Sequence, residues 1–277
     1  MTPLLICTDL DGTLLPNGSA IESPMARCYF QHLIQASNAQ LAYVSGHSLS
    51  LVEAAIQDYA LPKPHYIIAD VGASLYGAHQ HTWQPCMQWQ QHIIQTWSEH
   101  YVTQIKQLLQ GFPDLYLQAT AQQTTCKISY FAKRSVPPNV LLENLQRLFT
   151  QQHLTVNVIY SVDEITNIGL VDILPPRASK YHAIDFLRKQ QHILLKNTIF
   201  AGDSGNDLSV LVSDIPSILV KNADTQLKQQ VLQLSHAIKQ TDTLYIAQGH
   251  CLGLNGHYAA GIVEGILHYH PELQKLL

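Results

Sequence analysis

Short apolar runs recur in the first and last thirds of the chain, and each ends in small or acidic residues. The run at residues 4–7 is followed by acids, and the run at 198–201 is followed by Gly202-Asp203. Continuous apolar runs of this length are typical of buried parallel strands. Segments of helical length separate some of them, so the alternation predicts a parallel sheet covered by helices on both faces. The other runs cover residues 41–44, 66–69 and 218–220, and the helical segments cover 25–36 and 48–59.

The middle of the chain has a different pattern. Large apolar side chains recur at helical spacing from Trp89 to Leu108, which predicts a long helix. Two predicted strands, residues 126–131 and 155–160, then flank a predicted helix at 138–151. We expect the Trp and Tyr side chains of the long helix to be core rather than a binding platform. The fold class is therefore α/β, with a doubly wound parallel-sheet (Rossmann-like) core domain and an inserted α/β cap domain. The predicted limits are 1–77 and 171–277 for the core and 78–170 for the cap.

Two carboxylates follow the first predicted strand. In an extended segment, residues i and i+2 point to the same side, so Asp9 and Asp11 can serve one site. Gly12 allows the chain to turn, and Thr13 supplies a hydroxyl. A carboxylate nucleophile beside a carboxyl acid/base is what phosphoryl transfer through an aspartyl-phosphate requires. Taken alone, the pair is equally compatible with a cation site or with a solvated strand end.

Three further segments follow the same logic. Ser45-Gly46 and Gly202-Asp203-Ser204-Gly205-Asn206-Asp207 both follow predicted strands, and Lys180 opens a predicted helix. In doubly wound sheets, ligands bind outside the carboxyl ends of the strands. A phosphate beside several carboxylates needs cancelling charge, which Mg²⁺ and a lysine can supply, and Asp9 with Asp203 suits the oxygen preference of Mg²⁺. Considered singly, Asp203 and Asp207 could instead cap a helix, and Lys180 could be a surface lysine.

These motifs, in this order, resemble those of the haloacid dehalogenase-like phosphatases. Three further segments, Lys127-Ile128-Ser129-Tyr130, Val171-Asp172-Ile173-Leu174-Pro175 and Lys221-Asn222-Ala223, resemble the sucrose-phosphate phosphatase-like branch. The resemblance implies that Asp9 is the nucleophile and Asp11 the general acid/base. It also implies that Lys127 faces the sugar, and relatives often carry Arg where this chain has His47. The implied phosphate-binding residues are Ser45, Gly46, Lys180 and Asn206, with the Thr13 hydroxyl beside them, and the implied Mg²⁺ ligands are Asp9, the Asp11 carbonyl and Asp203, with Asp207 supporting the loop.

Composition narrows the function classes. Charged residues make up 13% of the chain, the net charge is −4, and no basic stripe is present, which argues against a general nucleic-acid binder. The first residues carry neither a signal-peptide pattern nor a run long enough to span a bilayer, so we expect no membrane partner. The five cysteines are widely spaced and form no C-x-x-C motif, which favours free thiols and a cytoplasmic location. We expect a monomer or a small homo-oligomer.

The sequence supports one leading hypothesis and two alternatives. The leading hypothesis is a Mg²⁺-dependent phosphatase that hydrolyses a small phosphorylated sugar, similar to sucrose 6-phosphate, through an aspartyl-phosphate on Asp9. A phosphomutase on the same scaffold is the first alternative. The second is a non-catalytic protein, either a phospho-receiver or a sugar-phosphate sensor. Gly46-His47-Ser48-Leu49-Ser50 lacks the closing Gly of a nucleophile elbow, and no P-loop motif occurs.

Overall fold

The computed structural model describes residues 3–80, 82–133, 135–163, 166–238 and 241–277. Its larger sheet has eight strands in the order β12-β11-β10-β1-β2-β3-β4-β5. All neighbours from β12 to β3 are parallel, whereas β4 and β5 pair antiparallel at one edge. The strands are β1 (Leu5–Thr8), β2 (Gln40–Val44), β3 (Tyr66–Ala69), β4 (Ser74–His79), β5 (Thr82–Pro85), β10 (Thr198–Gly202), β11 (Ser217–Leu219) and β12 (Leu244–Ile246).

Helices cover both faces of this sheet. Successive residues of a strand point to opposite faces, so Leu5 and Cys7 of β1 contribute to one apolar cluster and Ile6 contributes to the other. The first cluster includes residues of α6 (Lys180–Gln190), α7 (Leu208–Leu211) and α8 (Thr225–Ala237). The second includes residues of α1 (Ala26–Ser37), α2 (Leu49–Asp58) and α9 (Ala259–Tyr269). The predicted doubly wound core is thereby confirmed.

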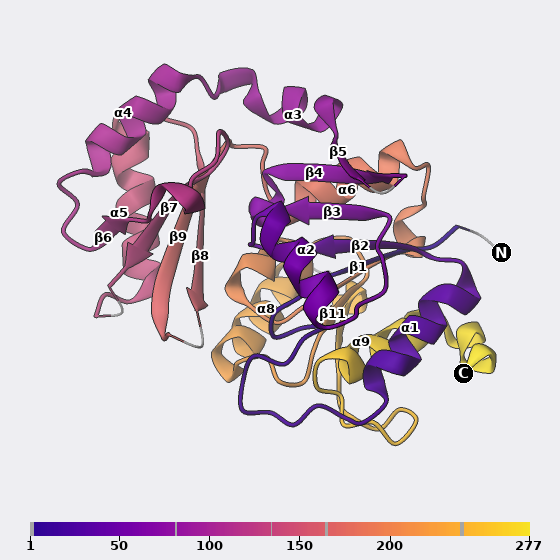
Figure 1. Cartoon of the computed structure of the whole chain (residues 1–277). Coiled ribbons are helices and arrows are strands. Elements are labelled where there is room, and N and C mark those ends of the chain that lie inside the picture. Colours follow the sequence, from indigo (N-terminus) through magenta and orange to yellow (C-terminus); the bar gives the residue numbers. More distant parts are fainter. Residues whose placement is uncertain (1–2, 81, 134, 164–165, 239–240) are drawn as a thin grey trace.

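A second, smaller sheet forms the cap, which projects from one side of the core (Figure 1). It is antiparallel, in the order β6-β7-β9-β8. Buried residues of two helices, among them Ile105 and Leu145, belong to the same apolar cluster as Ile128 and Val171 of the sheet. The cap elements are α3 (Met87–Ile93), α4 (Glu99–Leu109), β6 (Leu115–Leu117), β7 (Ile128–Ala132), α5 (Pro138–Gln151), β8 (Asn157–Asp163) and β9 (Ile168–Leu174).

Short 3₁₀ helices connect several of these elements. They are η1 (Asp70–Gly72), η2 (Ile94–Thr96), η3 (Thr120–Gln122), η4 (Leu195–Asn197), η5 (Gly205–Asp207), η6 (Thr241–Thr243) and η7 (Pro271–Leu276). No helix in the described residues is both long enough and apolar enough to cross a bilayer.

The prediction of one long helix from Trp89 to Leu108 is wrong. The segment is divided into α3, η2 and α4. Trp97 leaves the helical region with φ −105° and ψ 76°, and the Ser98 hydroxyl then accepts a hydrogen bond from Tyr101 N as the N-cap of α4. A capping serine satisfies a backbone donor that a continuous helix would not expose. Trp89 and Trp97 are nevertheless buried, as expected for core residues.

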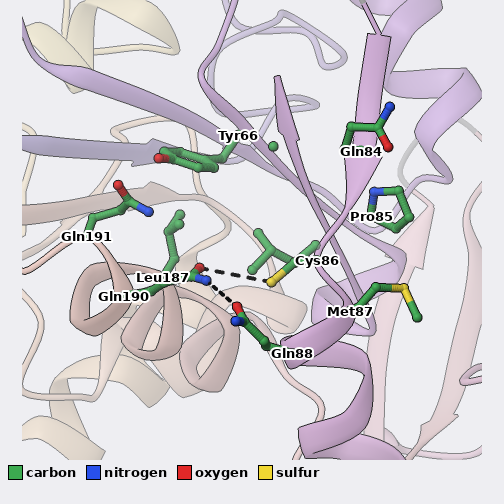
Figure 2. A pocket seen from close by; sticks show the side chains of 11 residues that line it. Tyr66, Gln84, Pro85, Cys86, Met87, Gln88, Leu187, Gln190 and Gln191 are labelled. Carbon is green, nitrogen blue, oxygen red and sulfur yellow. Dashed lines mark hydrogen bonds between the residues drawn. The ribbon is translucent and has the colours of Figure 1, made fainter. Parts of the chain in front are cut away.

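The sheets also bear on where the cap begins and ends. Strands β4 and β5 lie in the large sheet, and β9 lies wholly in the small one. The predicted limits at 78 and 170 therefore fall inside strands, and we propose limits near Cys86 and Pro175 instead. The chain first passes from core to cap near Cys86, beside a hollow of about 410 Å³. In this hollow, Gln190 of α6 donates a 2.7 Å hydrogen bond to Gln88 of α3 (Figure 2).

Candidate active site

The carboxyl ends of neighbouring strands bring the predicted site residues to one edge of the large sheet. Asp9 follows β1, Ser45 follows β2 and Asp203 follows β10. Because β10, β1 and β2 are adjacent and parallel, these residues become neighbours although they are far apart in sequence. This edge is separate from the hollow in Figure 2.

Asp9 is a buried carboxyl group that contacts a buried lysine. Its Oδ1 accepts a 2.8 Å hydrogen bond from Leu10 N, and its Oδ2 lies 2.9 Å from Lys180 Nζ. Burial raises the pKa of Asp9 to about 7, because it penalises the charged form more than Lys180 favours it. The carboxylate of Asp207 also contributes to this raised pKa. The predicted nucleophile therefore lies in a site that needs additional positive charge.

Lys180 is fully buried at the first turn of α6. The Ser179 hydroxyl caps this helix by accepting a hydrogen bond from His182 N, and the cap fixes where the lysine emerges. Lys180 Nζ donates to Asp207 Oδ1 at 2.6 Å in addition to its contact with Asp9. Burial alone would lower the pKa of Lys180, but the carboxylates of Asp207 and Asp9 raise it above its ordinary value. The lysine is thus held as a cation.

Asp207 supports the acidic loop. Its Oδ2 accepts hydrogen bonds from the backbone N of Asp203 at 3.0 Å and of Ser204 at 3.1 Å, and Ser204 and Asp207 form a reciprocal capping box. Both oxygens of Asp207 therefore have protein partners already. This geometry favours a role in positioning Lys180 and the loop over a role as a direct metal ligand.

Asp203 is buried opposite the turn that follows β1. Its Oδ1 accepts a 2.5 Å hydrogen bond from the Thr13 hydroxyl. Gly12 has φ +73°, and a Cβ there would lie 2.1 Å from Asp203 Oδ2, so only glycine permits this close approach. Since the Thr13 hydroxyl is directed at Asp203, we propose that Thr13 orients this carboxylate rather than binding phosphate.

The carboxylates form a cluster whose chemistry fits a divalent cation. Oxygen atoms of Asp9, Asp203 and Asp207 lie within 4.8 Å of one another. Three acids face one lysine, and burial together with the other two acids raises the pKa of Asp203 well above its usual range. A donor set made only of oxygen atoms, with excess negative charge, is the type that Mg²⁺ prefers. Asp9 and Asp203 are the residues that would hold it.

Asp11 is more exposed than these acids. Its Oδ2 lies 3.3 Å from Nδ1 of His47, and both side chains are nearly half exposed. The predicted acid/base is therefore partly accessible to solvent. The ring of His47 contacts the acid/base candidate directly.

The predicted phosphate-binding residues lie beside one another. Ser45 is buried, and its hydroxyl accepts a 3.1 Å hydrogen bond from His47 N. A Cβ on Gly46 would lie 3.5 Å from Asn206 Nδ2, which places the Asn206 amide next to this turn. The turn after β2 and the loop after β10 thus meet.

Lys127 reaches this turn from the cap. It is buried just before β7, and its Nζ donates to the Gly46 carbonyl at 3.3 Å. Its Nζ also lies 3.2 Å from Oδ1 of Asp70, a core residue that the sequence analysis did not assign to the site. Asp70 ends the predicted strand at 66–69 as Asp9 and Asp203 end theirs, and this pattern was a usable signal.

Asn222 is a second residue that was not assigned to the site. Its Nδ2 donates to the Gly12 carbonyl at 2.6 Å, and its Oδ1 accepts from Tyr258 N at 2.8 Å. The side chain therefore connects the turn after β1, which contains Gly12, to the segment that leads into α9. Its position after β11, at the same edge of the sheet, was the available signal.

A comparison with protein families assigns the chain to one of them. The model of the family described as sucrose-6F-phosphate phosphohydrolase matches residues 2–270. The chain belongs to this family. The predicted resemblance to haloacid dehalogenase-like phosphatases, and to their sucrose-phosphate phosphatase-like branch, is confirmed, and the predicted enzyme class, a phosphoric monoester hydrolase, agrees with it.

Individual relatives support the assignment. A putative HAD-like hydrolase of Nitrosococcus oceani is 42% identical over 269 residues, which cover 97% of this chain and 72% of the relative. Sucrose-phosphatase 2 of Nicotiana tabacum is 28% identical, and the match covers 96% of this chain but only 59% of the tobacco protein. The solved structure of the sucrose-phosphatase from Synechocystis sp. PCC6803, in complex with sucrose and phosphate, is 25% identical with a TM-score of 0.79, covering 98% of this chain and 99% of that one.

Proposed function

We propose that this chain is a Mg²⁺-dependent phosphatase that hydrolyses a small phosphorylated sugar through an aspartyl-phosphate on Asp9. The observation that carries the proposal is the buried Asp9–Lys180 pair at the end of β1, which is clustered with Asp203 and Asp207. A carboxylate nucleophile, a fixed cation and hydroxyl and amide donors are the components of phosphoryl transfer.

The chemistry divides between two carboxyl groups. Asp9 attacks phosphorus while the bond to the sugar oxygen breaks, and Asp11 gives a proton to that oxygen. Asp11 then takes a proton from a water molecule, which attacks the aspartyl-phosphate and regenerates Asp9. Asp9 and Asp203 would hold Mg²⁺, which would supply neutralising charge for the phosphate. Ser45, Gly46, Lys180 and Asn206 orient the phosphate.

The substrate class follows from the cap and from the relatives. Lys127 of the cap, whose Nζ lies at the Gly46 carbonyl, is the donor that we assign to a sugar hydroxyl group. The tobacco and Synechocystis relatives are named sucrose-phosphatases. We therefore propose sucrose 6-phosphate, or a sugar phosphate similar to it, as the substrate. A cytoplasmic location and a monomeric or small homo-oligomeric state stay predictions.

A screen of phosphorylated sugars with Mg²⁺ tests the proposal by measuring released phosphate. We expect one sugar phosphate to be hydrolysed far faster than the rest, and Asp9→Asn to abolish this activity. Conversion to a positional isomer without phosphate release, with a trapped bisphosphorylated intermediate, would establish the phosphomutase instead. Binding without turnover, even of an aryl phosphate, would establish the sensor or receiver.

A further inference from the structure

The segment directly after β3 has an unusual backbone. Asp70, Val71 and Gly72 have φ values of +53°, +58° and +96° in succession. Non-glycine residues rarely adopt this region, and a β-branched valine does so least readily. Strain of this kind persists only where the surrounding structure enforces it, and such sites are often functional.

Contacts on two sides hold this segment in place. Asp70 N donates to the His47 carbonyl at 2.9 Å, and Val71 N donates to the Ser45 carbonyl at 3.1 Å. On the other side, a Cβ on Gly72 would lie 2.6 Å from Lys180 N. The strained segment therefore joins the proposed phosphate-binding turn to the helix that carries the phosphate-pairing lysine.

The side chain of Asp70 extends this connection to the cap. Asp70 is buried, and its Oδ2 accepts a 2.9 Å hydrogen bond from the Ser74 hydroxyl. Its Oδ1 has no hydrogen-bond partner among the described residues by strict geometry, but it lies 3.2 Å from Lys127 Nζ. A buried carboxylate oxygen with no other partner is costly, so the ammonium of Lys127 provides its compensation.

Lys127 interacts electrostatically with carboxylates of both domains. Asp70 belongs to the core, whereas Asp172 on β9 belongs to the cap and accepts a 2.5 Å hydrogen bond from Ser129. Burial raises the pKa of Asp172, and the charge of Lys127 opposes that rise, so this second acid also interacts with the lysine. The ion pair with Asp70 therefore favours contact of the lysine with the core, whereas the attraction of Asp172 favours contact within the cap.

We propose that Asp70 is a positioning residue that holds the ammonium of Lys127 against the Gly46 carbonyl, so that the cap lysine can bind the leaving group of a substrate whose phosphate occupies the adjacent turn. An ammonium has three donors, and the contacts with Asp70 and Gly46 use two of them. In this proposal the third donates to an oxygen of the bound sugar. This inference rests on the proposed phosphatase function and assigns specificity to a residue of the core.

The variants Asp70→Asn, Lys127→Met and their combination test the proposal. Asparagine keeps the shape of the side chain and tolerates the left-handed backbone, but it removes the charge. We expect Asp70→Asn to raise KM for the sugar phosphate about tenfold or more. For p-nitrophenyl phosphate, kcat and KM should each change less than about twofold. The double variant should be no worse than Lys127→Met alone, because both substitutions remove one interaction.

Gln190→Ala is the matched control, because it removes a different hydrogen bond between cap and core without touching Lys127. Its KM for the sugar phosphate should stay near that of the parent. A parent-like KM for Asp70→Asn, additive effects in the double variant, or equal losses on both substrates would each overturn the proposal.

A structural measurement separates this inference from the proposed function. If the parent protein hydrolyses no phosphate ester, the proposed function fails, and small-angle X-ray scattering decides the role of Asp70 in holding the cap. In that case a larger radius of gyration for Asp70→Asn than for Gln190→Ala supports the role. Identical scattering of the parent and Asp70→Asn overturns it.

Discussion

At the scale of single residues, the site is defined by how burial acts on charged groups. Asp9, Asp203 and Asp207 are buried with Lys180, so three potential negative charges face one positive charge in a region that water does not stabilise. Burial raises the pKa of Asp9 and of Asp203 for this reason. The same cost that destabilises the free carboxylates favours binding of a divalent cation.

This imbalance predicts a pH dependence of stability. Asp9 has a folded-state pKa of about 7, above the value near 3.9 in an unfolded chain, so the folded protein binds more protons between these values. Without metal, the free energy of unfolding should fall as the pH rises from about 4 to about 7, by up to about 1.4 kcal/mol per pH unit for each such carboxyl. Urea unfolding with a chelator measures this slope. Added Mg²⁺ should reduce this slope and should release protons when it binds. A free energy of unfolding that does not change with pH in the absence of metal would contradict the raised pKa of Asp9.

The division of chemistry between Asp9 and Asp11 gives a second test. General acid–base catalysis contributes about 10²–10⁴-fold, and an aryl phosphate needs little protonation of its leaving group. We expect Asp11→Asn to form the phosphoenzyme from an aryl phosphate but to hydrolyse it slowly. Stopped-flow absorbance should therefore record a burst followed by a slow phase, and Asp9→Asn should give neither. Steady turnover of Asp11→Asn at the parent rate would remove Asp11 from the mechanism.

At the scale of elements, the sequence predicted where the strands end, but it did not predict all the side-chain contacts made there. Asp9, Ser45 and Asp203 were predictable because each follows a buried apolar run, and parallel strands bring their carboxyl ends together. The role of Asp70 was not predictable, because it depends on Lys127, which reaches the site only when the cap lies against the core. Strands β4 and β5 escaped prediction because most of their residues are partly or fully exposed, so neither forms a continuous apolar run.

The close approach of η1 to α6 gives a test at this scale. A Cβ on Gly72 would lie 2.2 Å from the carbonyl carbon of Ser179, so Gly72→Ala should displace the N-terminus of α6 and with it Lys180. We expect a loss of about 1–3 kcal/mol in the free energy of unfolding, together with a lower kcat. Gly253→Ala is the matched control, because Gly253 also has a positive φ of +73° but has nothing within 4 Å of the added Cβ. Equal effects of the two substitutions on kcat would contradict the role of this contact.

At the scale of the whole molecule, cap and core share buried contacts away from the carboxylate cluster of Asp9, Asp203 and Asp207. Trp89 of α3 is buried, its Nε1 donates to the Gly72 carbonyl at 3.1 Å, and its ring lies 5.2 Å from that of Phe186 on α6. This side chain therefore packs the start of the cap onto both η1 and α6. Because α6 also carries Lys180, the position of the cap and the geometry of the site both depend on the packing of this tryptophan.

Removing that side chain should affect both stability and specificity. Trp89→Ala should lower the free energy of unfolding by about 3–5 kcal/mol, because it leaves a large cavity at the junction. Trp89→Phe keeps an aromatic ring but loses the hydrogen bond to Gly72, so its cost should be smaller. Chemical denaturation and KM for the sugar phosphate measure the two effects. A stable Trp89→Ala variant with a parent-like KM would show that the cap is held without this contact.

The pairing of Thr13 with Asp203 joins positions 190 residues apart in the chain. The central strand β1 likewise has β10 as one of its two neighbours, so a growing polypeptide on the ribosome cannot complete the middle of the sheet until its last third has emerged. Structures dominated by such distant contacts fold slowly, because the chain loses the entropy of loop closure before the contact contributes favourable free energy. The turn that holds Gly12 and Thr13 therefore lacks its Asp203 partner until the loop after β10 has been synthesised, so its final geometry forms late.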